Sequence, residues 1–510
     1  MESKTQNRAI KKVAVLGSGV MGSGIALHLA NIGLEVLLLD IVPFDLKEEE
    51  KANPKLRNRI VNDAFSFALK SKPAQAYNAA SAARVSLGNF DDDMPKIKDC
   101  DWIIEVVIER LDIKQQVFEK VDKLRKPGTL VTSNTSGIPI HLMAEGRSED
   151  FQKHFCGTHF FNPPRYLRLL EIIPTAKTDQ SVVDFLMHYG DVFLGKETVL
   201  CKDTPAFIAN RVGVYAMAKV FQLTQELVLT IEEVDALTGP AIGRPKTGTF
   251  KLSDLVGNDT GTKVMMGIKE NCPNDEQAGA FEVPAYVQFL LDNKFFGNKS
   301  KKGYYYKDQK RNSFSLRLDT LQYEPTGKPK FASLDASKKV ESLNEKVNAF
   351  IKADDKGAQL VKRSLAGLFA YVSNRVPEIS DVLYAVDDAL RAGFAWEIGP
   401  FQYWDIVGVQ KGIELAEADG LAISAWVKEF VAAGNTSFYK VENGLKKYYD
   451  QASKSYKTIP GAESFIILDN LRSNKPVWKN SGGTLHDIGD GVLNLEFTSK
   501  MNSLGGDVLQ

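Results

Sequence analysis

The chain has 510 residues, too many for one hydrophobic core, and its length predicts about three or four domains. Its 64 basic and 64 acidic residues cancel, so the overall charge gives no reason to expect nucleic acid or an anionic membrane as a partner. The four cysteines lack metal-ligand spacing, which predicts a reduced compartment and no metal site. Residues 1–12 lack the apolar core of a signal peptide, and no segment reaches the roughly 18 apolar residues of a membrane span. We therefore expect a cytoplasmic protein without a membrane span.

The segment from Lys12 to Asp40 predicts a strand, a glycine-rich turn, a helix and a second strand. We expect Gly17 to form the turn, Gly19 to let a pyrophosphate approach the backbone, and Gly22 to allow close packing of helix and strand. The glycine spacing alone could also be a turn without a ligand. The strand before it and the helix after it favour a dinucleotide-binding site.

Asp40 ends the second strand and is placed to accept hydrogen bonds from an adenosine ribose. The next residues, 41–43, contain no cation that could bind a 2′-phosphate. The sequence therefore predicts NAD rather than NADP as the cofactor.

Three further strands are predicted at residues 84–88, 101–107 and 129–134, and helical segments separate them. Strands that alternate with helices predict a doubly wound parallel sheet, which binds ligands at the carboxyl ends of its strands. Asp40, Glu109 and Ser136 all follow such ends. We therefore expect them to lie at one edge of the sheet.

His159 and Glu171 are a candidate reactive pair, because a glutamate inside the aliphatic strand LLEII needs a partner and an imidazole is suitable. The alternative is that His159 satisfies a core hydrogen bond while Glu171 lies on a solvated strand face. The pattern of residues by itself leaves both interpretations open.

Four motifs in order decide between them: SNTSG at 133–137, HFFNPP at 159–164, LLEII at 169–173 and PAFIANR at 205–211. Together they resemble the L-3-hydroxyacyl-CoA dehydrogenase family over roughly residues 10 to 310. The resemblance implies NAD-dependent oxidation of the 3-hydroxyl of an acyl-CoA thioester to a ketone, as in fatty-acid β-oxidation.

The resemblance implies that His159 is the general base and that Glu171 holds its tautomer and stabilises the imidazolium. An imidazole titrates near the working pH, which suits it to removing the hydroxyl proton. Ser136 and Asn210 have short hydrogen-bonding side chains that suit the positioning and polarisation of substrate oxygens. We expect the helix that carries Asn210 to start at Pro205, with Asp203 or Thr204 as its N-cap.

The family's motifs also imply further cofactor contacts. Ser136 and Asn162 are expected at the nicotinamide end, and Asn162 is also expected to bind substrate. Glu109 and Lys114 match positions near the ribose and pyrophosphate. Met21 matches a position along the cofactor, and Lys299 matches a lysine near the nicotinamide. The motif around Lys299 departs from the family's pattern, because Lys301 occupies the position of its usual glycine.

Beyond about Lys202 the pattern becomes helical, and it then repeats. Asn374-Arg375 echoes Asn210-Arg211, Val386-Asp387 echoes Val234-Asp235, and residues 399–405 echo residues 248–254. We expect two copies of the helical unit, the second degenerate, with Asn374 a packing residue. The second copy is expected to complete the core and wall of the first.

The last residues resemble the opening of an enoyl-CoA hydratase (crotonase) domain around Ser499 to Leu504, after a strand at 491–497. The segments that hydratase chemistry needs lie further along in that family, so we expect no complete hydratase activity. Roughly the last 30 residues are expected to be poorly ordered because their sheet is missing.

The predicted fold class is an α/β Rossmann-type NAD-binding domain, two all-α helical C-terminal repeats and a short, incomplete crotonase-like tail. The expected boundaries are 1–201 for the NAD-binding domain, 202–310 for the first helical domain, 311–357 for a linker, 358–455 for the second repeat, and 456–510 for a linker with the tail.

Two alternatives to the dehydrogenase remain: a β-hydroxyacid dehydrogenase for a small free acid, and a non-catalytic NAD-binding or scaffold protein. The HFFNP motif together with Glu171 argues against the first, since such enzymes usually rely on a catalytic lysine. The presence of His159, Glu171, Ser136 and Asn210 together argues against the second. A homodimer or a thiolase partner is consistent with the resemblance.

Overall fold

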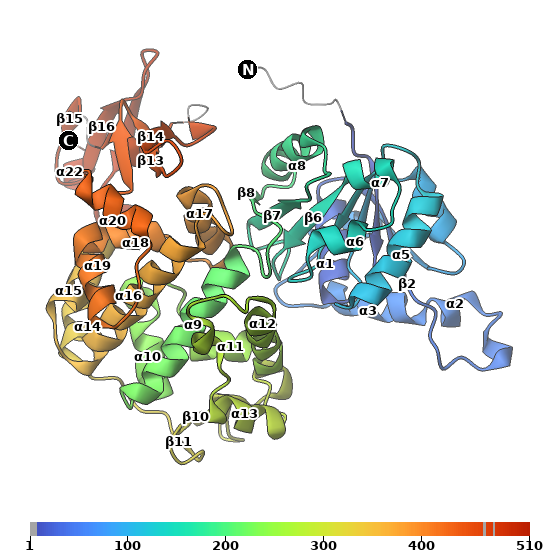
Figure 1. The fold of residues 1–510 in the computed structure, drawn as a ribbon, viewed down its shortest axis with the longest axis horizontal. Helices are drawn as coiled ribbons and strands as arrows, with labels where there is room; N and C mark the ends of the chain where they lie inside the picture. The colour runs from blue at the N-terminus through green and yellow to red at the C-terminus, as the bar shows by residue number, and fades with distance from the viewer. Residues whose placement is uncertain (1–7, 463–465, 473–474, 510) are drawn as a thin grey trace. The chain divides into compact units, whose positions relative to one another are not determined.

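The structure is a computed structural model that describes residues 8–462, 466–472 and 475–509. The first seven residues of the polar N-terminus considered above lie outside the described residues. The chain divides into two compact units, residues 1–424 and 425–510 (Figure 1). Each unit is described by itself below.

The first unit begins with an eight-stranded sheet in the order β3-β2-β1-β4-β5-β6-β7-β8. The strands are β1 (Lys12–Leu16), β2 (Glu35–Asp40), β3 (Val85–Asn89), β4 (Trp102–Glu105), β5 (Leu130–Ser133), β6 (Phe155–Phe160), β7 (Leu169–Pro174) and β8 (Glu197–Leu200). Neighbouring strands are parallel except β6 and β7, which are antiparallel. The parallel sheet predicted from the first five strands is confirmed. The antiparallel pair β6–β7 was not predicted, and here a short connection joins the two strands without a crossover helix.

Helices cover both faces of this sheet, as the doubly wound pattern predicts (Figure 1). The helices of this part of the chain are α1 (Val20–Asn31), α2 (Pro54–Arg57), α3 (Arg59–Leu69), α4 (Ala79–Ala82), α5 (Leu111–Leu124), α6 (Ile140–Ala144), α7 (Glu149–Lys153) and α8 (Gln180–Val192), of which α2 lies on an extension away from the sheet. On one face Trp102 meets Tyr189 of α8 edge to face. Phe118 of α5 packs on Phe151 and Phe155. Alternate side chains of the buried strands thereby enter two hydrophobic layers.

Helices follow the sheet domain. They are α9 (Ala209–Glu226), α10 (Ile231–Leu237), α11 (Phe250–Val256), α12 (Asn258–Asn271) and α13 (Ala285–Asp292). The 18-residue helix α9 packs against α12, α16 and α17, the last two of which come from later in the chain. Buried residues lie on most sides of α9, which makes it the central helix of this region.

The segment expected to be a linker contains regular structure. It holds part of a three-stranded antiparallel sheet of β9 (Tyr305–Lys307), β10 (Ser313–Leu316) and β11 (Tyr323–Pro325), and then α14 (Ala332–Ser337) and α15 (Leu343–Lys352). Helices α16 (Lys356–Arg375), α17 (Leu383–Phe394), α18 (Pro400–Val407) and α19 (Val409–Ala418) complete the first unit. The polar composition of residues 311–357 therefore belongs to short elements packed at a surface.

The two similar stretches of sequence, residues 248–254 and 399–405, begin helices α11 and α18 with the same arrangement of a glycine and an aspartate. Asp235 accepts hydrogen bonds from the backbone N–H groups of residues 249, 250 and 251 at the start of α11. Asp387 accepts one from Phe401 at the start of α18. A side chain at Gly248 or at Gly399 would overlap the backbone of the corresponding aspartate. A glycine and an aspartate therefore close the same helix junction twice.

The second unit contains α20 (Ala425–Ala432), α21 (Leu468–Leu471), α22 (Gly506–Leu509) and two small antiparallel sheets. One sheet is β12 (Tyr439–Glu442), β13 (Leu445–Asp450) and β14 (Ser455–Thr458). The other is β15 (Trp478–Lys479), β16 (Gly483–Asp487) and β17 (Leu493–Phe497). The expectation of a tail without a sheet is wrong, because β16 pairs with both β15 and β17.

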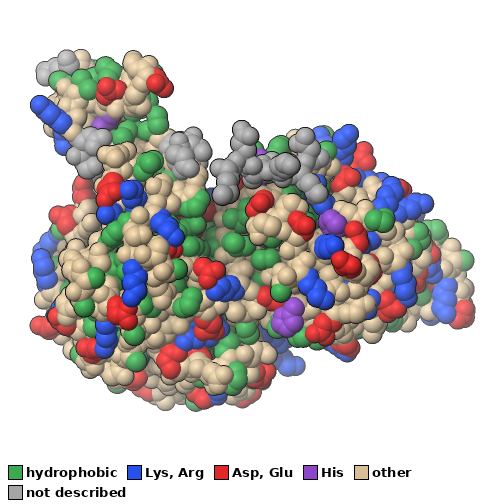
Figure 2. Space-filling view, turned by 45° about the horizontal axis from the view of Figure 1, so that its top comes forward, with side chains coloured by type: hydrophobic (Ala, Val, Ile, Leu, Met, Phe, Trp, Pro, Cys, Tyr) green, Lys and Arg blue, Asp and Glu red, His purple; other side chains and the backbone are tan. Residues whose placement is uncertain are grey.

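Basic and acidic side chains are interspersed on the face drawn in Figure 2. This mixture agrees with the balanced composition of the chain, and neither sign dominates that face. Among the described residues, no helix combines the length and the apolar character needed to cross a bilayer.

Candidate active site

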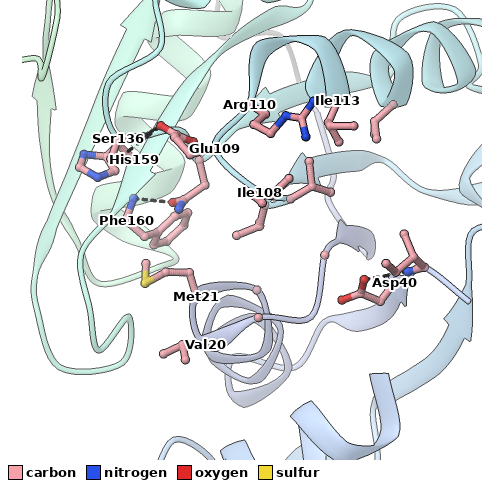
Figure 3. A pocket seen from close by; sticks show the side chains of 18 of the residues that line it. Val20, Met21, Asp40, Ile108, Glu109, Arg110, Ile113, Ser136, His159 and Phe160 are labelled. Atoms are coloured by element: carbon pink, nitrogen blue, oxygen red, sulfur yellow. Dashed lines mark hydrogen bonds between the residues drawn. The ribbon is translucent and has the colours of Figure 1, made fainter. Parts of the chain in front are cut away.

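A cavity of about 1110 Å³ extends from the glycine loop after β1 to the start of α9 and to α12 (Figure 3). Most of the predicted site residues lie on its wall: Gly17, Gly19, Met21, Gly22, Asp40, Glu109, Ser136, His159, Asn162 and Asn210. Figure 3 shows Asp40 well apart from His159 and Ser136, with Glu109 turned toward Ser136. The cavity is therefore elongated and presents different chemistry at its two ends.

The three glycines of the loop meet three different surroundings. Gly17 has a φ of +106°, and a Cβ there would lie 2.5 Å from the carbonyl oxygen of Val106. A Cβ at Gly22 would overlap the carbonyl oxygen of Gly17. A Cβ at Gly19 would have no atom within 4 Å. Gly17 and Gly22 are needed for the loop itself, whereas the space beside Gly19 is open to a ligand.

This open space lies at the N-terminus of α1. Gly19 is the N-cap of α1, and no side chain caps the helix there. The first N–H groups of a helix have no partner within it, and they favour an anion such as a phosphate. The loop therefore suits the pyrophosphate of a dinucleotide.

Asp40 lies at the end of β2 beside the same loop. Its Oδ2 accepts hydrogen bonds from the Ser18 N–H at 2.6 Å and from the Ser18 hydroxyl at 2.5 Å. Its Oδ1 accepts one from the Ile41 N–H at 2.7 Å. These contacts hold the carboxylate at the cavity wall, where it can accept hydrogen bonds from ribose hydroxyls and would repel a 2′-phosphate.

Glu109 binds the loop that carries Ser136. Its Oε1 accepts hydrogen bonds from the Thr135 hydroxyl at 2.5 Å and from the Ser136 N–H at 2.9 Å. Its Oε2 pairs with the Lys114 amine at 3.2 Å. Burial raises the pKa of Glu109, but Lys114, Thr135 and Ser136 outweigh it, and the net pKa lies below its ordinary value. Glu109 is therefore a charged acceptor in the cavity.

Glu105 and Ser133 extend this network into the core. The Lys114 amine pairs with Glu105 Oε1 at 2.7 Å, and the Ser133 hydroxyl donates to Glu105 Oε2 at 2.5 Å. Glu105 is fully buried, and burial raises its pKa although Lys114 opposes the rise. Glu105 and Ser133 were not among the site residues predicted from the sequence. The sequence feature that could have identified Glu105 is its position as an acidic residue at the end of an otherwise apolar strand.

His159 and Glu171 are directly opposite each other on β6 and β7. The imidazole Nδ1 lies 2.7 Å from Glu171 Oε2, and Glu171 is completely buried. The interpretation that places Glu171 on a solvated strand face is therefore wrong. Cross-strand partners in an antiparallel pair bring their side chains together on one face, which explains how two residues distant in sequence meet.

The second oxygen of Glu171 caps α9. Glu171 Oε1 accepts hydrogen bonds from the Ile208 N–H at 3.1 Å and from the Ala209 N–H at 2.8 Å. A carboxylate with these donors can only accept from His159, so Nδ1 carries the proton and Nε2 has a free lone pair. His159 is therefore oriented as a base whose basic nitrogen is Nε2.

The start of α9 differs from the prediction. Ala206 and Phe207 have positive φ, and the helix begins at Ala209. Asp203 instead accepts hydrogen bonds from the N–H groups of Ile140 and His141 at the start of α6. The predicted cap by Asp203 or Thr204 is therefore wrong, because Glu171 supplies the cap from another strand.

Ser136, Asn162 and Asn210 come from three separate segments and reach the same cavity. Asn210 is the second residue of α9, one position after the Ala209 N–H that Glu171 binds. Asn134, also on the wall, accepts a hydrogen bond from the Phe160 N–H at 2.8 Å. Polar side chains therefore converge at the end of the cavity that holds His159.

Lys114 and Lys299 are placed differently from the other predicted cofactor contacts, since neither lies on the cavity wall. Lys114 is buried and reaches the site through Glu109. Lys299 pairs with Asp259 at the start of α12 and is about half exposed. Lys301, at the position of the motif's usual glycine, has a φ of +61°. In the part of the chain that the structure describes, no group of three or more His, Cys, Asp or Glu residues could hold a metal ion.

Comparison with protein-family models assigns most of the first unit. Residues 12–204 match the model described as 3-hydroxyacyl-CoA dehydrogenase, NAD binding domain. Residues 207–307 match the model of the 3-hydroxyacyl-CoA dehydrogenase C-terminal domain. The boundary between the matches falls just before α9, where the sheet ends and the helices begin.

Curated relatives carry the same description. A probable 3-hydroxyacyl-CoA dehydrogenase of Bacillus subtilis is 43% identical over 99% of this chain, and the chain spans 64% of that relative. One of Deinococcus radiodurans is 45% identical over 58% of this chain and 83% of its own length. The crystal structure of 3-hydroxybutyryl-CoA dehydrogenase from Escherichia coli has a TM-score of 0.60 at 22% identity, covering 83% of this chain and 99% of that chain. At that identity the similarity concerns the fold alone.

Proposed function

Because the chain belongs to the 3-hydroxyacyl-CoA dehydrogenase family, we propose that it oxidises the 3-hydroxyl of an L-3-hydroxyacyl-CoA thioester to a ketone with NAD. In a cell this reaction would be a step of fatty-acid β-oxidation. The observation that carries the proposal is the buried His159–Glu171 pair, which lies on the same cavity as the dinucleotide-binding loop. The chain spans about two thirds of the length of the Bacillus subtilis relative. The proposal therefore concerns the dehydrogenase activity of this chain and not every activity of the longer relative.

The proposed chemistry begins with proton transfer to His159. Nε2 takes the proton of the substrate 3-hydroxyl, and the electron pair left on oxygen forms the carbonyl as hydride leaves the same carbon. Glu171 then faces an imidazolium at 2.7 Å and stabilises its charge. Because Glu171 is also held by two backbone N–H groups at the start of α9, its carboxylate cannot turn away from His159 without breaking the helix cap.

The residues that would hold the cofactor are those of the glycine loop, Asp40 and Glu109. The uncapped N-terminus of α1 suits the phosphates, and the two carboxylates can accept hydrogen bonds from ribose hydroxyls. Bound NAD supplies the hydride acceptor. Met21 lies between Asp40 and His159 (Figure 3), along the path that an extended dinucleotide would follow.

We propose that Ser136, Asn162 and Asn210 position the substrate. Their side chains reach the cavity near His159 and can donate hydrogen bonds to the oxygen on which charge develops. Glu109 fixes the backbone at Ser136 and so contributes indirectly. The proposed roles of Lys114 and Lys299 are also indirect: Lys114 neutralises Glu109, and Lys299 pairs with Asp259, the neighbour of Thr260 on the cavity wall.

The helices from α16 onward are best explained as a second, degenerate copy of the helical unit. The shared Gly–Asp junctions at α11 and α18 support this interpretation. Asn374 donates to the carbonyl oxygens of Ala370 and Ala422, which fits a packing role. The domain boundaries given above and the crotonase-like nature of the tail stay predictions, as does the absence of complete hydratase activity.

The remaining predictions concern the surroundings of the enzyme. Its four cysteines are all buried and unpaired, which supports a reduced compartment such as the cytoplasm. A homodimer or a thiolase partner stays a prediction.

The test is the consumption of NADH with acetoacetyl-CoA, repeated with NADPH and with free acetoacetate. We expect rapid turnover only with NADH and the thioester. Turnover of the free acid alone would favour a small-acid dehydrogenase. Binding of NADH by a folded protein without turnover of either substrate would favour a non-catalytic protein.

A further inference from the structure

The helix α17, from the second helical segment, contacts the sheet domain beside the reactive pair. A Cβ placed on Gly393 would lie 2.7 Å from Leu169 Cδ2, 3.5 Å from Ala209 Cβ and 3.5 Å from Phe161 Cε1. These three residues lie on β7, on α9 and just after β6. A single glycine of α17 therefore meets all three segments that carry the reaction residues.

Each contact is adjacent to a group of the proposed mechanism. Leu169 begins β7, the strand that carries Glu171. Ala209 donates its N–H to Glu171 Oε1 and precedes Asn210. The ring centroid of Phe161 is 4.5 Å from that of His159, and Phe161 lies on the cavity wall. A displacement of α17 would therefore shift His159, Glu171 and Asn210.

Other contacts hold α17 in this place. The ring of Phe394 fills the position that a side chain at Gly213 of α9 would occupy. Lys202, just after β8, pairs with Asp381 at 2.6 Å at the start of this segment, and its backbone N–H donates to the Ile379 carbonyl at 3.1 Å. These interactions fix both ends of the segment from 379 to 394 against the sheet domain and α9.

We propose that Gly393 is a positioning residue of the active site: its lack of a side chain lets α17 support Phe161, Leu169 and Ala209, and so keeps His159, Glu171 and Asn210 aligned. The proposal rests on the proposed function and adds a residue from the second helical segment to it. Close packing transmits such a displacement, and a shift of about 1 Å can cost about 10²-fold in rate.

The test is a graded pair of substitutions in the full chain. In Gly393→Ala the flexible end of Leu169 can yield, so we expect kcat to fall about tenfold or less. In Gly393→Val the larger side chain also meets Ala209 and Phe161, and we expect a fall of about 10²-fold. The KM for NADH should stay within about twofold, because none of the three atoms nearest the new Cβ belongs to the glycine loop or to Asp40.

The matched controls are Gly267→Ala and Gly267→Val. Gly267 is also a helical glycine, in α12, but a Cβ there would have no atom within 4 Å. Both pairs replace a helical glycine with the same side chains, but only at Gly393 does the new side chain meet the segments that carry the reaction residues, so kcat should fall only in the Gly393 pair. Equal kcat in the two pairs would overturn the proposal.

A readout other than turnover separates positioning from general destabilisation. We expect the NMR titration midpoint of the His159 imidazole to move in Gly393→Ala and to stay fixed in Gly267→Ala. An unmoved midpoint would overturn the proposal. If wild-type protein does not turn over acetoacetyl-CoA but the midpoint moves, the proposed function fails and the positioning role stands.

If Gly393→Val does not fold, Gly393→Ala combined with Leu169→Ala decides the question. Truncation of Leu169 removes the atom nearest to the new methyl group. The fall in kcat of the double variant, expressed as an activation free energy, should then be smaller than the sum of the falls in the two single variants. Strict additivity would show that the contact with Leu169 transmits nothing.

Discussion

At the scale of single residues, burial distinguishes the roles of three carboxylates: Asp40, Glu109 and Glu171. Asp40 and Glu109 are carboxylates held in place by hydroxyl and backbone donors, and each leaves a face toward the cavity. Glu171 is instead completely buried and does not line the cavity. The first two can therefore bind a ligand, whereas Glu171 can only act through His159.

Replacement of Asp40 tests the choice of cofactor. In Asp40→Ala a charged acceptor of the ribose hydroxyls is lost, so we expect the KM for NADH to rise about 10- to 100-fold, as for a charged hydrogen bond. The preference for NADH over NADPH should also shrink, since repulsion of the 2′-phosphate disappears. The control is Asp45→Ala, since Asp45 pairs with Arg59 away from the cavity wall. An unchanged KM in Asp40→Ala would contradict the assignment.

His28 of α1 predicts a loss of stability in acid. Its side chain is buried beside Lys196, and burial lowers the pKa of His28 to about 4. Between pH 6.5 and about 4 the unfolded chain binds a proton that the folded chain does not, so the free energy of unfolding falls by up to about 3 kcal/mol as the pH falls.

The comparison is with His28→Gln, which does not titrate but can still donate to the Leu194 carbonyl that faces His28 Nε2. Urea unfolding should show that the free energy of unfolding falls more between about pH 7 and about pH 4.5 in the wild type than in the variant. Equal losses would show that His28 is not responsible for acid sensitivity.

At the same scale, most of the site residues predicted from the sequence lie on the cavity wall, because each ended a strand or belonged to a family motif. It missed Glu105, which looks like one more residue of the strand at 101–107 until Lys114 is seen to pair with it. Gly393 was also missed. A glycine in a helix has no sequence signal that distinguishes close packing from simple tolerance.

At the scale of secondary-structure elements, the antiparallel pair β6–β7 and the start of α9 together position the reactive pair. The register places His159 opposite Glu171, and Glu171 then caps α9. The sequence predicted β7 as an aliphatic strand, but it showed neither β6 nor the relative direction of the two, because two buried strands have the same composition in either direction. The start of α9 was misplaced for a related reason. Pro205 is a common helix-start signal, but the next two residues adopt positive φ and the cap comes from β7.

Lys301 gives an element-scale prediction. It has left-handed geometry and is exposed, which costs an L-residue about 1 kcal/mol. In Lys301→Gly this cost is relieved, less the added entropy of glycine in the unfolded chain, so we expect a gain of about 0.5 kcal/mol. Urea denaturation would measure it, with Lys301→Ala as the control that keeps a Cβ. An equal gain in both variants would mean that φ is not the cause.

At the scale of the whole molecule, the cavity lies entirely within the first unit, residues 1–424, whereas residues 425–510 form a unit of their own. The sequence showed the change from alternating strands to helices and the internal echoes. It did not show the short strands β9–β11, because three- or four-residue strands in polar segments have too few residues for a periodic pattern. In the tail it predicted the strand at 491–497, which is β17, but not β15 and β16.

Hydrogen exchange of the full chain tests this division. A ligand that binds the folded state protects the segments it stabilises. NADH should slow exchange in the glycine loop and around residues 105–110 and 134–136, and it should leave residues 425–509 unchanged. Protection confined to the second unit would contradict the placement of the cofactor site.

The most direct test of the account compares wild type with His159→Ala in one assay, the reduction of acetoacetyl-CoA by NADH, together with NADH affinity measured by fluorescence. The account predicts that the rate falls by about 10² to 10⁴-fold, as expected for loss of a general acid–base group, while NADH affinity stays within about twofold. A wild-type rate in His159→Ala would contradict the role of the His159–Glu171 pair.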